Sequence, residues 1–118
     1  MSVIEIKGMR FYSFHGCFEE ERTIGTNFEV DVSLNVDTTK AQKTDALTDT
    51  VNYAEVYMRV KEQMEKSSHL LEHVADRIAT ALLDEFDAIC SVAVKVSKMN
   101  PPLGGQMERV SVTIDKSR

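Results

Sequence analysis

Hydrophobic and polar residues alternate along four stretches of this chain, which is the pattern of strands that bury one face. In the clearest stretch, 27–36, every second residue from Phe28 to Val36 is apolar and the residues between them are polar. Stretches 3–12, 88–98 and 108–115 show the same period. Gly8 interrupts the first of them, which predicts a bulge there. The sequence therefore predicts four strands.

Two stretches between the second and third strands have a helical period instead. The first begins near Tyr53, and its apolar residues are Ala54, Val56, Tyr57, Val60 and Met64. The second runs to about Glu85, with apolar residues Leu70, Leu71, Val74, Ala75, Ile78, Ala79, Leu82 and Leu83. Ser68 is in a suitable position to cap this second helix. Residues 17–26 are predicted to be a charged loop, residues 38–50 a turn-rich connection, and residues 100–105 a stiff loop containing both prolines.

The order of these elements, ββααββ, predicts an α+β domain with two helices on one face of a four-stranded, largely antiparallel sheet. We expect the 118 residues to form this single domain, 1–118. The opposite face would be polar, with Glu29, Asp31, Ser33, Asn35, Lys95, Ser97, Arg109, Ser111 and Thr113. A small sheet with two free edges favours pairing between subunits, and several copies could close into a ring-shaped barrel with a wet interior.

The composition of the chain argues against some classes of binding partner. A net charge of -5 argues against nucleic acid and against an acidic membrane surface. No apolar run reaches membrane-spanning length, and the N-terminus lacks the layout of a signal peptide, so we expect a cytoplasmic protein. The two cysteines, Cys17 and Cys90, have no ligand spacing and are expected to be free thiols, with Cys90 buried at a strand entrance.

Five side chains are candidates for catalysis or for binding a ligand. His69, Glu72 and His73 spell a zinc-protease pattern, but no third ligand follows, and two surface histidines are the favoured interpretation. Glu72 lies in the first turn of a helix, whose dipole would stabilise its carboxylate. Tyr53 at a helix start and Lys98 at a strand end could each transfer protons, or could each be only a solvated side chain. His15 and Gly16 are predicted to form a turn.

Taken together and in order, five segments resemble the dihydroneopterin aldolase family. They are Phe14-His15-Gly16, Glu21-Arg22-Thr23-Ile24-Gly25, Asp49-Thr50-Val51-Asn52-Tyr53, Leu70-Leu71-Glu72-His73-Val74 and Lys98-Met99-Asn100-Pro101-Pro102. The resemblance covers the whole chain. It implies the tunnelling fold, a homotetramer or homo-octamer with active sites between subunits, and a pterin substrate.

The resemblance also implies roles for individual residues. Glu72 would bind the pyrimidine edge of the pterin, with backbone contacts from Leu71 and Val51. Tyr53, from the neighbouring subunit, would transfer protons, Lys98 would lie near the reacting centre, and Glu21 would place that lysine and its waters.

The implied reaction is retro-aldol cleavage of 7,8-dihydroneopterin to glycolaldehyde and 6-hydroxymethyl-7,8-dihydropterin in folate biosynthesis, with 2′-epimerisation as a side activity. No metal, no other cofactor and no Schiff base is expected. The alternatives are an epimerase acting on dihydroneopterin or its triphosphate, a pterin-binding ring protein without catalysis, and a metal-dependent enzyme of the same fold.

Overall fold

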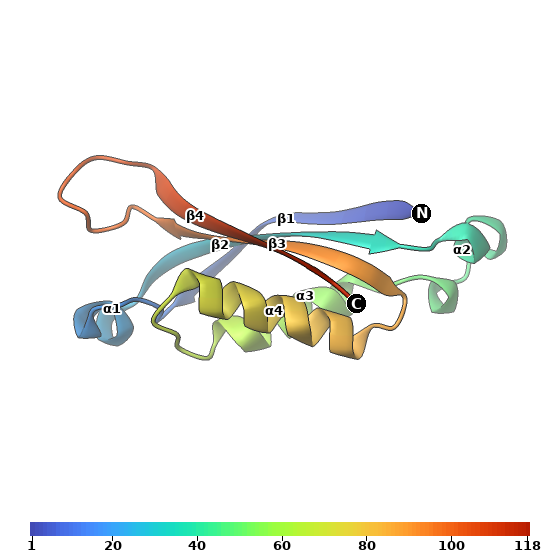
Figure 1. Ribbon diagram of the computed structural model, residues 1–118, viewed down its shortest axis with the longest axis horizontal. Helices are drawn as coiled ribbons and strands as arrows, with labels where there is room; N and C mark the ends of the chain where they lie inside the picture. Colours follow the sequence, from blue (N-terminus) through green and yellow to red (C-terminus); the bar gives the residue numbers. More distant parts are fainter.

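The computed structural model describes residues 1–118 as an antiparallel sheet with a layer of helices beneath it (Figure 1). The elements are β1 (Ser2–Ser13), α1 (Glu19–Ile24), β2 (Thr26–Val36), α2 (Thr39–Thr44), the 3-10 helix η1 (Leu47–Asp49), α3 (Tyr53–Met64), α4 (Leu71–Glu85), β3 (Ile89–Met99) and β4 (Arg109–Ser117).

The sheet has the order β1-β2-β3-β4, with every neighbouring pair antiparallel. α3 and α4 cover one face, α4 against β3 and β4 and α3 against β1. The predicted ββααββ architecture is therefore confirmed. The bulge in β1 is also present, because the register shifts between Ile6 and Met9 and Gly8 has a φ of 72°.

The core lies between the sheet and the two long helices. Alternate residues of β2 and β3 face it, and so does the apolar stripe of α4, because both periods place apolar side chains on one side. Its buried members include Phe28, Val30, Val32, Leu34, Val36, Val92, Val94, Val96, Val56, Val60, Met64, Val74, Ile78 and Leu82.

The face of the sheet away from the helices is polar, as predicted. Cross-strand rows run Glu29–Ser97–Ser111 and Asp31–Lys95–Thr113. Arg109 forms an ion pair with Glu29 across this face, at 3.1 Å.

Two predicted loops contain helix. Residues 17–26 include α1, whose first turn carries Glu19, Glu20 and Glu21, where carboxylates stabilise a helix N-terminus. Residues 38–50 include α2 and η1, and α2 ends at Asp45 in a left-handed conformation. Both helices have only six residues, and neither has a buried residue. No apolar period in the sequence could therefore reveal them.

Two further predictions were wrong. Leu70, not Ser68, occupies the N-cap position of α4. The Ser68 hydroxyl instead contacts His73 Nδ1 at 2.8 Å and accepts a hydrogen bond from Arg77 at 2.9 Å. Cys90 is a free thiol, as is Cys17, but Cys90 is exposed because it follows the inward-facing Ile89 on β3.

The molecule is elongated, with principal extents of 53 × 24 × 22 Å. Figure 1 shows α1 and the β3–β4 loop at one end of the sheet and α2 at the other. The chain passes from α2 through η1 into α3, so α3 begins on the α2 side and α4 begins on the α1 side. None of the helices combines the length and the hydrophobicity that a membrane-spanning helix requires.

Candidate active site

Lys98 follows Val92, Val94 and Val96 at the next alternate position of β3, so its side chain lies on the same face of the sheet as theirs. In the register of β2 and β3, Val32 pairs with Val94, Val30 with Val96, and Phe28 with Lys98. Side chains at alternate positions share a face, so the Lys98 side chain projects toward the helix layer at the end of the strand. It is 14% exposed.

Glu21 from α1 meets this lysine. Lys98 Nζ lies 2.5 Å from Glu21 Oε2, and the Glu21 side chain is 15% exposed. The other carboxylate oxygen, Oε1, accepts the backbone N–H of Phe18 at 3.4 Å, as in a capping box. The carboxylate is therefore fixed both by its own helix start and by the lysine, although the two residues are 77 positions apart.

Gly16 leaves room for the Glu21 side chain. A Cβ at position 16 would lie 2.5 Å from Glu21 Cβ and 2.6 Å from its Cδ, which no residue tolerates without a shift. Arg22 holds the same loop by donating to the carbonyls of Gly16 and Cys17 at 2.8 and 2.9 Å. The loop before α1 thus shapes the placement of Glu21.

Glu21, Lys98 and Leu71 line one cavity of about 180 Å³. The remaining lining residues are Cys17, Phe18, Pro101, Pro102, Leu103 and Val110. Pockets for small ligands usually enclose about 300 Å³ or more, so this cavity is small for a complete binding site.

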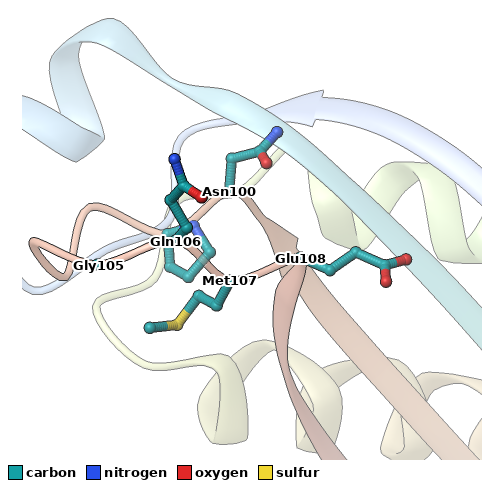
Figure 2. Close-up of a pocket in the computed structure, with 6 residues that line it drawn as sticks. Asn100, Gly105, Gln106, Met107 and Glu108 are labelled. Atoms are coloured by element: carbon teal, nitrogen blue, oxygen red, sulfur yellow. The ribbon is translucent and has the colours of Figure 1, made fainter.

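A larger cavity, about 520 Å³, lies in the β3–β4 loop. Figure 2 shows the Glu108 side chain there pointing away from Asn100 and Gln106. None of the predicted site residues lines it. Size alone therefore does not identify the site.

Glu72 follows Leu71 in the first turn of α4. Its side chain is exposed and has no ion-pair partner in the chain, whereas Asp76, one turn later, pairs with Lys116. Leu71, its neighbour in sequence, lines the cavity, and the exposed Glu72 carboxylate is accessible to a ligand from solvent.

Val51 and Tyr53 are not at this cavity. Tyr53 is the first residue of α3 and is 67% exposed, and Val51 is buried just before it. At 1.5 Å per residue, Tyr53 lies about 17 Å along the helix from Met64, which ends α3 near the start of α4. One chain therefore brings together Glu21, Leu71 and Lys98, with Glu72 next to Leu71 on α4, and holds the other two predicted residues at the far end of α3.

His15 is a residue that sequence reasoning undervalued. It is 1% exposed, and its Nδ1 accepts the backbone N–H of Ser68 at 3.1 Å. Its ring meets Phe28 edge to face, with centroids 5.1 Å apart. Its buried Nε2 has no hydrogen-bond partner. A lone histidine in a loop has no period to signal burial, so only its place in the Phe-His-Gly segment could have singled it out.

The histidines of the zinc-protease pattern are both exposed, as predicted for surface residues. His73 Nδ1 is already engaged by the Ser68 hydroxyl. No group of three or more histidine, cysteine or acidic side chains is arranged to hold a metal ion. That the reaction needs no metal stays a prediction.

Burial, together with the positive charges of Arg77 and Lys98, lowers the pKa of His15 from 6.5 to about 4. The unfolded chain, with a histidine pKa near 6.5, binds the proton first as pH falls. The His15 contribution to the free energy of unfolding is thus complete above about pH 6.5 and declines from there to about pH 4.

We expect His15→Asn to remove this part of the acid sensitivity. Between pH 7 and pH 5 the wild-type protein should lose about 2 kcal/mol more than the variant, because 1.5 pH units correspond to about 2 kcal/mol. Urea unfolding at fixed protein concentration, at pH 7 and at pH 5, measures the free energy of unfolding of the wild-type protein and of the variant. An equal loss in the two proteins would show that His15 is not the titrating group.

Comparison with known proteins decides the family. The family model for FolB, dihydroneopterin aldolase, matches residues 4–115. Dihydroneopterin aldolase of Streptococcus pyogenes serotype M18 is 39% identical over 119 residues, covering 100% of both chains. The enzyme of Staphylococcus epidermidis is 41% identical over 113 residues, covering 95% of this chain and 93% of its own.

The chain belongs to the dihydroneopterin aldolase family. The predicted lyase activity, dihydroneopterin aldolase of the folate pathway, is confirmed by this assignment. A solved dihydroneopterin aldolase, from E. coli in complex with neopterin, has a TM-score of 0.91 and 27% identity, covering 99% of this chain and 100% of its own. The tunnelling fold of the family is thereby confirmed as well.

Proposed function

We propose that this domain cleaves 7,8-dihydroneopterin in a site formed by Glu72, Leu71, Glu21 and Lys98 of one subunit and by Val51 and Tyr53 of its neighbour. The ion pair between Lys98 Nζ and Glu21 Oε2 beside Leu71 is the observation that supports this most strongly. An ammonium group and a fixed carboxylate side by side at one small cavity are what the proposed proton transfer requires.

Glu72 would bind the pterin by its pyrimidine edge. That edge offers an amino group and a ring N–H, and an ionised carboxylate can accept both as charge-assisted hydrogen bonds. The Glu72 carboxylate is exposed at the start of α4, where the helix dipole stabilises its charge. The neopterin bound to the E. coli relative has the same edge.

The retro-aldol step then proceeds within the substrate. A base takes the proton of the 2′-hydroxyl, the C1′–C2′ bond breaks, and glycolaldehyde leaves. The electron pair enters the C6=N5 imine, giving an enamine protonated at N5. Protonation at C1′ with loss of the N5 proton gives the hydroxymethyl product. The pterin itself is the electron sink, so the proposal includes neither a metal nor a lysine Schiff base.

We assign the proton steps to two side chains. Lys98 assists protonation at N5, directly or through water, and Glu21 holds the ammonium group in place. Tyr53 exchanges protons at the side-chain hydroxyl and at C1′. Re-addition of glycolaldehyde from the other face would give the 2′-epimer, the proposed side activity.

The two half-sites support a ring. One chain carries Lys98 at one end and Tyr53 at the other, so a complete site needs a head-to-tail contact between copies, and such contacts form rings when they close. β1 and β4 are the free edges of the sheet. Exposed apolar side chains lie near both halves: Leu47, Tyr53, Tyr57 and Met58 at one, and Phe18, Leu70, Leu103 and Val110 at the other. We propose a homotetrameric ring, alone or stacked as a homo-octamer.

Mixed rings test this arrangement. Lys98→Ala and Tyr53→Phe homomers should both be nearly inactive, because each lacks one proton-transfer group at every site. After co-refolding in equal amounts, about one quarter of the sites should contain both wild-type residues, with activity to match. Glycolaldehyde release in the presence of a chelator measures the recovery and also tests independence from metal.

Tyr57→Phe is the matched control, because Tyr57 lies one turn along α3 and stacks on Phe11 at 5.8 Å. It should leave turnover unchanged. A mixture no more active than its two components would show that Lys98 and Tyr53 do not act across a subunit contact.

A further inference from the structure

The loop before α1 and the turn before α4 are joined by a short series of hydrogen bonds. The Ser67 hydroxyl donates to the Phe14 carbonyl. Gly16 N–H donates to the Ser68 carbonyl at 2.9 Å, and Ser68 N–H donates to His15 Nδ1 at 3.1 Å. The backbone of Ser68 thus donates one hydrogen bond to His15 and accepts one from Gly16, the next residue of the loop. The His15 bond is the one that depends on a side-chain acceptor within the loop.

On the loop side, this contact leads to the Glu21–Lys98 pair. Gly16 lies directly against the Glu21 side chain, so its position limits where that carboxylate can be. The His15 ring packs against Phe28, which is paired with Lys98 in the sheet. Glu21 therefore lies against Gly16, and Lys98 lies beside Phe28, the packing partner of His15.

On the helix side, the contact leads to α4. Arg77 Nη2 donates to the Ser68 hydroxyl and to the Lys66 carbonyl, at 2.9 and 2.7 Å. Its Nη1 donates to the Gln63 carbonyl at 3.1 Å. The turn is thereby fixed to a side chain from within α4, the helix that begins with Leu71 and Glu72.

We propose that His15 is a positioning residue for the reaction: by accepting the Ser68 N–H, it fixes the Glu21–Lys98 pair relative to the pterin anchor Glu72. This inference rests on the proposed roles of those three residues. The bond requires a neutral imidazole with its proton on Nε2. Burial of the ring favours that neutral form, and so do the positive charges of Arg77 and Lys98, the second of which is paired with Glu21.

If the Glu21–Lys98 pair moves relative to Glu72, turnover should fall while the affinity for the pterin stays the same. Glu72 stays on α4, which is held by its own core contacts, so pterin affinity is preserved. The proton donor is misplaced, and errors of about 1 Å in such groups lower rates by about 100-fold. A role in stability alone would lower the melting temperature without separating turnover from affinity.

Three substitutions of His15 separate these outcomes. The Asn Oδ1 lies where His Nδ1 lies, so His15→Asn keeps the acceptor. The Gln amide lies nearer the Nε2 position, so His15→Gln keeps polarity and loses the bond. His15→Leu loses both. We expect kcat to fall at least about tenfold in the Gln and Leu variants and to stay within about twofold of wild type in Asn.

Affinity for neopterin, by fluorescence titration of the assembled protein, should stay within about twofold in all three variants. Should His15→Leu fail to fold, the Asn and Gln pair still decides. Equal kcat in Asn and Gln overturns the proposal, as does unchanged kcat in Gln and Leu. Lys98→Ala is assayed alongside: if it is active, the proposed function fails, and if it alone is inactive, only the positioning role fails.

Discussion

Lys98→Ala is expected to lower kcat by about 100-fold or more, the usual contribution of a positioned proton donor. In the wild-type protein Lys98 Nζ lies 2.5 Å from Glu21 Oε2, in the cavity that Leu71 also lines. The substitution removes the donor and leaves the Glu21 carboxylate without its cation. Initial rates of 6-hydroxymethyl-7,8-dihydropterin formation measure the effect.

Two variants make this result specific. Lys98→Arg keeps a positive charge beside Glu21, but a guanidinium does not give up its proton, so turnover should stay low while the fold is preserved. Lys95→Ala removes the lysine three residues earlier on β3, on the polar face opposite the helices, and should leave kcat unchanged. Wild-type turnover in Lys98→Ala at an unchanged melting temperature would contradict the assignment.

Glu72→Ala is expected to weaken pterin binding by about 100-fold, since two charge-assisted hydrogen bonds are lost and each contributes about 1.5 kcal/mol or more. The fold should tolerate the change, because the side chain is exposed and has no ion-pair partner in the chain. Titration of the intrinsic fluorescence of neopterin gives the dissociation constant directly.

Glu72→Gln sharpens the interpretation. The amide presents a donor to a pterin edge that itself consists of donors, so the isosteric variant should bind no better than Glu72→Ala. Asp76→Ala, one turn further along α4, removes an exposed carboxylate that pairs with Lys116 and should bind neopterin normally. Normal affinity in Glu72→Ala would exclude an anchoring role for this residue.

The sequence predicted the parts of the fold that bury a regular stripe. β2, β3 and α4 each bury apolar residues at the spacing of a strand or a helix, and their bounds agree with the prediction within a few residues. α1 and α2 were missed because six-residue helices with no buried side chain leave no such period. Ser68 was misassigned as a cap because its side chain is used by Arg77 and His73 instead.

The site was predictable only in part, for a different reason. Glu21 and Lys98 are 77 residues apart, and no local pattern indicates that they meet. The family resemblance supplied them as candidates, and the structure brings them together. The burial of His15 depends on Phe28 and Ser68, residues far from it in sequence. Contacts of this kind depend on how the layers pack, which a single sequence does not show.

The buried stripe of β3 has a consequence for how this protein can change. Lys98 points into the site only because it is an even number of residues from Val92, Val94 and Val96. One residue inserted after Val96 would turn that side chain into the opposite face of the sheet and abolish turnover, whereas two could restore its direction. The catalytic rate therefore depends on whether the number of residues between Val96 and Lys98 places both side chains on the same face of β3. An activity assay would detect a one-residue shift in strand pairing that leaves the secondary-structure content unchanged.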